Sequence, residues 1–355
     1  MNIAAQISSY NHIDELKNNF IYQCLTALAK NDASVQILFI TDKDFISPRE
    51  KTENIKFLSA SPSNKQIVYR LYWNMYKLPK IISGFDADVF FSDRTFPEKK
   101  IKAKKILWIN NISELKSLKK NILLADLILC PNHHFSEIIE KTFLLSKDKL
   151  AVINPGIDSG ILPLEFEEKE KIKTQYANGA EYFYFDGLSA NLDTIKKTLQ
   201  AFSLFKKWQK SSMKMMITTD MKKQKGFLEM LNNYKYREDV IYMNAAELDN
   251  FEVVCAASYA AVFFPEKTSI DSRVTNCLAG ETPVILTDDE FYRSSFGNTV
   301  LYAKENVEAI AENLILLYKD ESIRNNLIAR GKELSSGLTW QKSAVELAKR
   351  AKELI

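Results

Sequence analysis

Residues 261–290 read AVFFPEKTSIDSRVTNCLAGETPVILTDDE. An apolar run, Ala261 to Phe264, ends at Pro265; a polar loop follows, and Val274 to Ala279 then has a helical period. A second apolar run spans Pro283 to Leu286. The order strand, loop, helix, strand is that of a parallel sheet, in which ligands bind outside the carboxyl ends of the strands. The polar loop is therefore the expected place for a ligand.

The length and composition of the chain indicate two globular domains. The chain has 355 residues, which is more than one core usually fills. It is 46% hydrophobic and 26% charged, as ordinary globular proteins are. Forty-eight basic residues oppose 45 acidic ones, and a formal charge of +3 gives no argument for nucleic-acid binding. We expect no nucleic-acid partner.

The first half of the chain alternates short apolar runs with segments of helical period, which predicts a doubly wound α/β sheet. Asn2 to Ile7 and Val35 to Ile40 are the first two strands, and Ile13 to Lys30 is the helix between them. The turn after the first strand contains no glycine, so we interpret it as a helix start capped by Ser9 or Asn11.

The amino-terminal residues and the cysteines both predict a cytoplasmic protein. Met1 to Tyr10 lacks the basic start and apolar core of a secretory signal, and no run of about 18 apolar residues follows anywhere. Peripheral contact with the inner membrane surface is the most that we expect. The four cysteines lie in apolar segments without paired spacing, which predicts buried thiols in a reducing compartment. They are Cys24, Cys130, Cys255 and Cys277.

Two short motifs are better explained by structure than by metal binding. His133 and His134 are adjacent and would point apart on a helix, so we interpret them as a helix entry. The Asp86-Ala87-Asp88 triplet precedes a strand at Val89 to Phe91, where a turn is expected. We expect no metal and no other cofactor.

One helix, Gln66 to Ser83, mixes basic and aromatic residues around a proline at position 79. Such a helix can rest on an anionic membrane or on a stacking ligand. The interpretation that we favour is an amphipathic helix whose aromatic residues face the core, broken or kinked at the proline.

The opening stretch resembles the donor-sugar motif of family 4 glycosyltransferases of the GT-B fold, roughly P-S-x-x-E-G-F-G-x-P-x-x-E-A-x-x-x-G-x-P-V. The segment AVINPGIDSGILP, Ala151 to Pro163, is similar to the interdomain V-I-x-N-G-V-D of that family. Gly187 and Ala201-Phe202 match its next strand, loop and helix. The resemblance implies two Rossmann-like doubly wound parallel-sheet domains facing a cleft, with a final helix returning to the first domain. We place the domains at 1–155 and 156–337 and the returning helix at 338–355.

The family's activity is the transfer of a sugar, with retention, from a nucleotide-sugar to a glycan or lipid-linked acceptor, without a metal. At several functional positions of the family's motifs this chain has a different residue. The first motif glutamate falls on Thr268 or Ser269, the second on Asn276, and the glycine before P-V on Glu281. The arginine and lysine that grip the diphosphate fall on Leu188 and Asp193, and a His-Asp pair of the first domain falls on Asn110 and Asn111.

Two hypotheses follow from these differences. In the first, the protein is an active glycosyltransferase with a remodelled donor site, in which Glu266, Asp271 or Asn110 are the candidate catalytic residues. In the second, it is a non-catalytic relative that binds a partner, such as another glycosyltransferase of polysaccharide biosynthesis. An epimerase or a sugar-binding protein of the same shape is a more distant third. The candidate donor-binding residues are Gly187, Lys196, Lys197, Lys267, Thr268, Ser269, Arg273 and Asn276.

Overall fold

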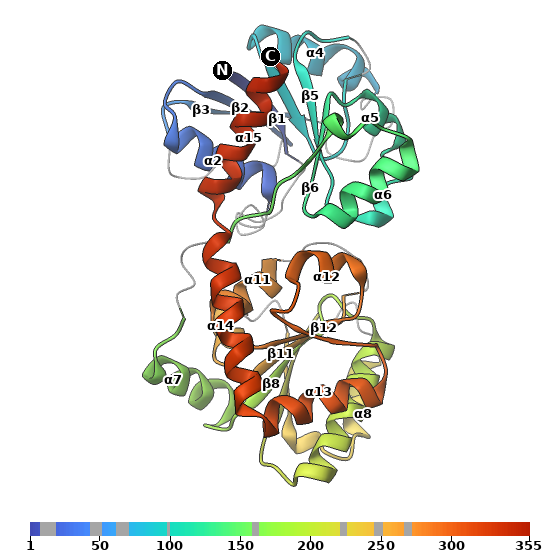
Figure 1. Cartoon of the computed structure of the whole chain (residues 1–355), viewed down its shortest axis with the longest axis vertical. Coiled ribbons are helices and arrows are strands. Elements are labelled where there is room, and N and C mark those ends of the chain that lie inside the picture. The colour runs from blue at the N-terminus through green and yellow to red at the C-terminus, as the bar shows by residue number, and fades with distance from the viewer. Residues whose placement is uncertain are drawn as a thin grey trace. The chain divides into compact units, whose positions relative to one another are not determined.

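The computed structural model describes residues 1–7, 19–42, 52–61, 71–97, 100–157, 163–220, 226–244, 251–265 and 272–355. They form two compact units, Met1–Asp158 with Leu338–Ile355 and Ser159–Gly337. Each unit is a parallel sheet covered by helices (Figure 1), so the predicted α/β class with two Rossmann-like domains is confirmed. No helix in these ranges is both long and apolar enough to cross a membrane.

The first unit contains a seven-stranded sheet of order β3-β2-β1-β4-β5-β6-β7. Its neighbours in the sheet all pair in parallel. The elements are β1 (Asn2–Gln6), α2 (Phe20–Asn31), β2 (Gln36–Asp42), β3 (Ile55–Ser61), the π-helical turn η1 (Trp73–Lys77), α4 (Leu78–Gly84), β4 (Val89–Ser92), β5 (Lys104–Trp108), the 3-10 turn η2 (Ile112–Glu114), α5 (Lys119–Leu124), β6 (Leu127–Cys130), α6 (His133–Phe143), the 3-10 turn η3 (Lys147–Lys149), β7 (Leu150–Val152) and α15 (Trp340–Leu354).

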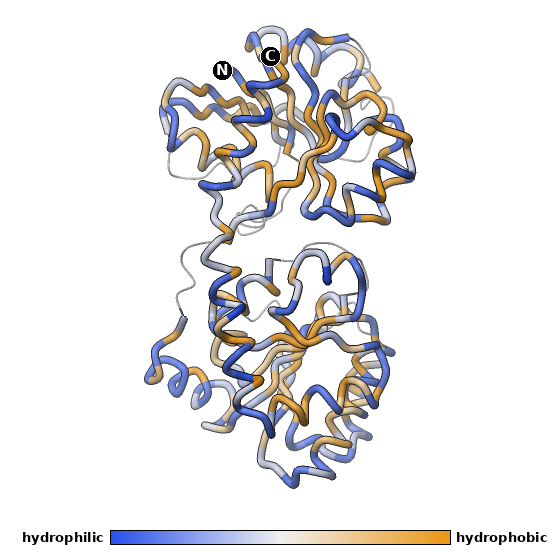
Figure 2. Tube along the Cα trace, in the orientation of Figure 1, coloured by the Kyte–Doolittle hydropathy of each residue, from blue (hydrophilic) through white to orange (hydrophobic). Residues whose placement is uncertain are grey.

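The second unit contains a six-stranded parallel sheet of order β10-β9-β8-β11-β12-β13. Figure 2 shows apolar residues concentrated in the strands of both units. The elements are α7 (Phe166–Ala177), β8 (Tyr182–Asp186), α8 (Leu192–Gln209), β9 (Lys214–Thr219), α9 (Phe227–Asn232), the 3-10 turn η4 (Arg237–Asp239), β10 (Val240–Asn244), α10 (Phe251–Ala256), β11 (Ala260–Phe263), α11 (Ser272–Ala279), β12 (Val284–Thr287), α12 (Glu290–Phe296), β13 (Leu301–Ala303), α13 (Val307–Lys319) and α14 (Glu321–Gly337).

Helix α15 returns to the first unit and packs beside α2 (Figure 1), as predicted. Ala344, Leu347 and Ala351 recur at intervals of three and four, and all three are buried in the core that α2 shares with the sheet. The main chain at Gly156 lies directly against the start of α15, because a Cβ at Gly156 would lie 2.2 Å from the main-chain nitrogen of Trp340. Only glycine fits there.

The two faces of the first sheet are covered by different helices. Val89 and Phe91 pack into the core with α2 and α15, whereas Phe90 between them is buried but belongs to the opposite face. Helices α4, α5 and α6 add no residue to the core of α2 and α15, and Figure 1 shows α5 and α6 away from that pair. They therefore cover the opposite face.

The aromatic helix of the first unit differs from its prediction. The chain is helical from Leu71, widens into η1 just before Pro79 and continues as α4, so the expected irregularity is present. Trp73 is fully buried, but Tyr72 and Tyr76 are exposed. The prediction that the aromatic residues face the core is therefore wrong for these two tyrosines, because their positions lie on the outer side of the turn. Tyr69 and the earlier residues of this helix lie outside the described ranges.

Two interpretations of short motifs are confirmed. Helix α6 begins at His133, with Asn132 as its cap. The Asp86–Asp88 segment is a turn: Asp86 has φ = 53°, and the Asp88 carboxylate accepts a hydrogen bond of 2.8 Å from the main-chain N–H of Asn2. The predicted caps Ser9 and Asn11 lie outside the described residues, and α2 is described from its cap Asn19 onward.

Candidate functional site

The carboxyl ends of the strands in the second sheet meet at one edge, because all of them run in the same direction. At this edge β8 ends at Asp186, β9 at Thr219, β11 at Phe263 and β12 at Thr287. Helices α8 and α11 begin just after β8 and β11. Their first turns and the end of β8 bring together the polar side chains described below.

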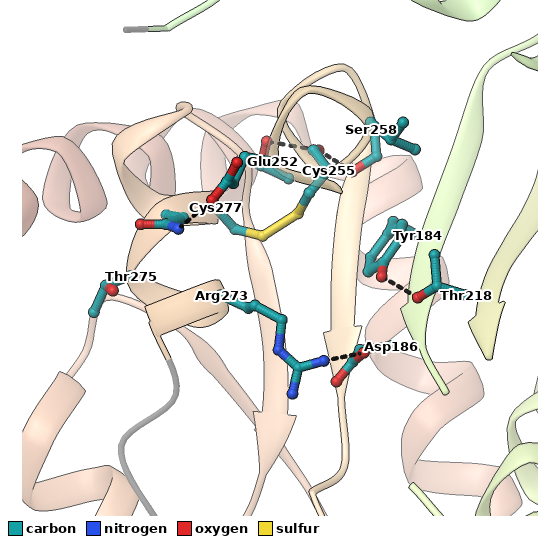
Figure 3. Close-up of a disulfide and its surroundings, with 12 residues drawn as sticks. Tyr184, Asp186, Thr218, Glu252, Cys255, Ser258, Arg273, Thr275 and Cys277 are labelled. Atoms are coloured by element: carbon teal, nitrogen blue, oxygen red, sulfur yellow. Dashed lines mark hydrogen bonds and ion pairs between the residues drawn. A yellow bond between two sulfur atoms is a disulfide. The ribbon is translucent and has the colours of Figure 1, made fainter. Parts of the chain in front are cut away.

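Asp186 is the most deeply buried charged group at this edge. Its side chain is inaccessible to solvent, and its Oδ1 accepts a hydrogen bond of 2.7 Å from Nη1 of Arg273 (Figure 3). The Ser189 hydroxyl donates to Oδ2, and the main-chain N–H of Leu188 donates to Oδ1 at 3.3 Å. A buried carboxylate needs such donors, since water cannot solvate it. Arg273 is thus held over the end of β8.

Gly187 follows Asp186 at a point where the chain passes close to β9. A Cβ at this position would lie 2.6 Å from the main-chain oxygen of Thr218, closer than any side chain tolerates. The Thr218 hydroxyl in turn bonds the buried phenol of Tyr184 (Figure 3). The predicted glycine is therefore required for the turn between β8 and α8, whether or not a ligand lies against it.

The first two turns of α8 carry an acid, Asp193, and a cation, Lys197. Asn191 caps the helix through the N–H of Thr194, at 3.0 Å. Lys197 bonds Asp193 at 2.7 Å and Glu305 at 3.0 Å, and these hydrogen bonds, with Asp193 first, raise the pKa of Lys197. The lysine is therefore charged at neutral pH but already paired. Lys196, its neighbour, is exposed.

Helix α11 is fastened to α10 by two contacts. Nδ2 of the buried Asn276 lies 3.4 Å from Oε1 of Glu252. Beside it Cys255 and Cys277 form a disulfide (Figure 3). The prediction of four buried thiols is wrong for this pair, because the strand between α10 and α11 folds the two helices side by side. Cys24 and Cys130 are buried free thiols, as predicted.

The predicted site residues are distributed unevenly. Gly187, Arg273 and Lys197 lie at the carboxyl edge, and Asp186 links the first two. Asn110 follows β5 in the first unit. Sequence reasoning missed Asp186, Glu252 and Glu305; only Asp186 had a signal, as an acid ending the aromatic run of β8 before a glycine. Glu266, Lys267, Thr268, Ser269 and Asp271 lie outside the described residues.

No group of three or more His, Cys, Asp or Glu side chains suited to hold a metal is found in the described ranges. The hydrogen-bond donors at the carboxyl edge are instead the guanidinium of Arg273 and the main-chain N–H groups of the Gly187 turn and of the start of α8. Such donors suit an anion.

Residues 167–334 match the family model of glycosyl transferases group 1, which spans nearly all of the second unit. The chain carries a glycosyl transferases group 1 domain. This match and the two parallel sheets identify a glycosyltransferase of the GT-B fold. A comparison with curated protein sequences gives no match.

Several solved structures resemble this chain over nearly its full length and theirs. A glycosyltransferase from Rickettsia africae superposes with a TM-score of 0.75 at 14% identity, with 99% of this chain and 98% of that one covered. WaaG, a glycosyltransferase of lipopolysaccharide biosynthesis, gives 0.71 at 10% identity, with 98% of each covered. HepE of Anabaena, in complex with UDP and glucose, gives 0.72 at 12% identity, with 99% and 100% covered. At such low identity these likenesses show the fold.

Proposed function

We propose that this glycosyltransferase binds a nucleotide-sugar at the carboxyl edge of its second sheet and transfers the sugar, with retention, to a glycan or lipid-linked acceptor. The observation that carries the proposal is Arg273, which belongs to a group 1 domain and reaches the end of β8 beside the Gly187 turn. A departing nucleoside diphosphate gains negative charge, and a guanidinium with adjacent main-chain N–H groups stabilises that charge.

The same geometry sets the conditions for binding. Arg273 is paired with Asp186 and Lys197 with two carboxylates, so a diphosphate has to share or replace these partners. The side chain of Arg273 is 23% exposed, and the N–H groups of its guanidinium that do not bond Asp186 can donate to a phosphate. Exposed Lys196 adds a second positive charge. Glu266 and Asp271 remain the candidate carboxylates for the sugar.

Titration calorimetry with UDP, GDP and ADP and their glucose derivatives tests the proposal, together with an assay for released nucleoside diphosphate. We expect one nucleotide to bind, and Arg273→Ala to weaken it at least tenfold, since a charged hydrogen bond is lost. Arg330→Ala, an exposed arginine of α14, is the control and should leave the affinity unchanged. Absence of binding at millimolar nucleotide would refute the proposal. If Arg273→Ala unfolds the domain, Arg273→Lys, which keeps the charge without the fork, replaces it.

A second candidate is a non-catalytic partner of another glycosyltransferase. It is favoured by the pairing of Arg273 and Lys197 with carboxylates, because a site built for a diphosphate gains from free cations. Under this alternative no donor is hydrolysed by the chain alone, and a glycosyltransferase purified in stoichiometric complex with it loses activity when the chain is removed. Donor turnover by the isolated chain excludes it.

A further inference from the structure

Charge is divided unequally between the two units. The first unit contains 26 lysines and arginines against 19 acids, a formal charge of +7. The second contains 22 against 26, a formal charge of −4. The small net charge of the chain therefore conceals a basic unit and an acidic one. A basic unit is drawn to anionic partners over a distance of about one Debye length.

Part of the basic charge forms a stripe on α5 and the turn before it. Main-chain hydrogen bonds from Leu118 to Glu114 and from Ile122 to Leu118 connect this turn to α5. The residues at 119, 120, 123 and 124 fall on one face of α5, and they are exposed, as is Lys116 in the turn before it. Leu115, Leu118 and Ile122 are buried on the other face. We name the exposed set the Lys–Leu stripe: Lys116, Lys119, Lys120, Leu123 and Leu124.

The leucines of the stripe are unusual at such positions. Leu123 is 52% exposed and Leu124 41%, although both lie on a regular helix with lysines one turn before them. Exposed leucines beside lysines form a surface that is apolar at its centre and cationic at its border, since the long lysine side chains extend outward past their neighbours. The exposed apolar area indicates an interaction surface.

Few acids balance the stripe. Between residues 100 and 125 the sequence has seven lysines and one acid, Glu114. Among the ion pairs of the described residues, neither Lys116 nor Lys119 takes part. The next acid after the stripe, Asp126, accepts a hydrogen bond from the main-chain N–H of Lys105. The positive charge of Lys116 and Lys119 is thus available to an outside partner.

A second exposed apolar group belongs to the same face of the first sheet. Leu71, Met75 and Tyr76, in the helical segment that leads into α4, are 53%, 42% and 56% exposed. Lys80 lies exposed on α4 itself. Because α4 and α5 both cover the face opposite α2 and α15, this group and the Lys–Leu stripe share one side of the unit.

We propose that this side of the first unit docks on an anionic membrane surface. The Lys–Leu stripe supplies the two contributions to binding at a membrane surface. Its leucines can enter the boundary of the bilayer, and its lysines attract the lipid phosphates. The Lys–Leu stripe fits a nucleic acid less well, since its exposed leucines offer neither a stacking plane nor a hydrogen bond to a base, and the exposed Tyr76 lies outside the stripe. The inference does not depend on the proposed function, because docking requires no nucleotide and no catalysis.

Vesicle co-sedimentation tests the proposal with the full chain. The probes are vesicles of phosphatidylcholine alone and vesicles in which about a third of the lipid is phosphatidylglycerol. We expect binding to the anionic vesicles only, and its loss in high salt. Lys119→Glu with Lys120→Glu should weaken binding at least tenfold, since each lysine near an anionic surface contributes roughly fivefold. Leu123→Gln with Leu124→Gln should also weaken it at least fivefold.

Matched controls lie on α15, which covers the other face. Lys342→Glu with Lys349→Glu changes the charge equally, and Val345→Gln removes an apolar side chain that is 63% exposed. Both should bind vesicles as the unchanged protein does, and all variants should melt within a few degrees of it. Binding without anionic lipid, or equal binding by the stripe variants and the controls, would overturn the proposal. So would competition by single-stranded RNA that is unaffected by the leucine changes, which would assign the surface to nucleic acid.

Discussion

Asp193 determines how readily α8 can meet a phosphate. Asp193 stands at the position where the family's phosphate-binding lysine is expected. It precedes Lys197 by one turn, and its carboxylate lies 2.7 Å from the amino group of Lys197. An acid in the first turn of a helix stabilises the helix, but it repels an anion approaching the same end. At this residue helix stability and anion binding oppose each other.

Asp193→Asn should therefore strengthen nucleotide binding. The change removes one of the two acidic partners of Lys197, and the hydrogen bond to Glu305, which also raises the pKa of Lys197, keeps the lysine charged. We expect the affinity for UDP to rise up to about fivefold, as for other exposed ion pairs. Calorimetry measures the change, and Glu238→Gln, an equal charge change at an 88% exposed position, is the control. A lower or unchanged affinity would mean that Lys197 does not contact the phosphates.

The sequence predicts the role of some residues of the site but not the contacts of others. Gly187 was predictable, because a glycine between a strand and a helix usually marks a tight turn in which a side chain would clash. The partner of Arg273 is 87 positions away, and Glu305, the second partner of Lys197, is 108 positions away. No local sequence pattern predicts contacts between residues so far apart, because these contacts form only when the sheet brings distant loops to one edge.

At the scale of elements, the pairing of α10 with α11 is the main departure from the prediction. Cys255 and Cys277 are 22 residues apart, a spacing that carries no disulfide signal in a sequence. The link exists because β11 lies between the two helices and returns the chain to the same side of the sheet. Apolar runs identified the central strands, such as β8 and β11, because these are buried along their whole length, whereas the edge strand β10 is only partly buried.

Counting thiols tests this pairing directly. Burial raises the pKa of the Cys130 thiol to about 12 and that of Cys24 further, so the thiolate that reacts with Ellman's reagent is scarce in the folded protein at pH 8. We expect no reactive thiol in the native state, two in denaturant and four in denaturant with a reductant. Four thiols in denaturant alone would show that Cys255 and Cys277 are not bonded.

Helix α15 should be essential to the stability of the first unit. Leu347→Ala empties a buried position against α2 and should lower the free energy of unfolding by about 2–5 kcal/mol. Val345→Ala, on the same helix but exposed, should change it by less than about 0.5 kcal/mol. Urea unfolding followed by circular dichroism distinguishes the two. Equal effects would show that α15 is not packed as described.

At the scale of the whole molecule, each unit has a core of its own. The first core includes α2 and α15, and the second is built on β8, α8 and α13. Two separate cores of this size can unfold independently. The sequence indicated this division through its length and through the glycine and proline residues of its central segment.

Calorimetric melting should accordingly resolve two transitions. Leu347→Ala should lower only the transition of the first unit, and reduction of the disulfide only that of the second, because closing a loop of 22 residues contributes about 3 kcal/mol. A single transition that moves with both changes would show that the two cores melt as one.

The return of α15 also constrains how the protein can be made. The ribosome produces residues 1–158 first, yet the core that they form stays open on the α2 side until residues 338–355 have been added. The whole second unit is synthesised in between, and it can fold while the first is still incomplete. During that interval the apolar surface of α2 needs protection from aggregation. Any event that stops translation within the second unit leaves a first domain with its core exposed, a substrate for chaperones and proteases.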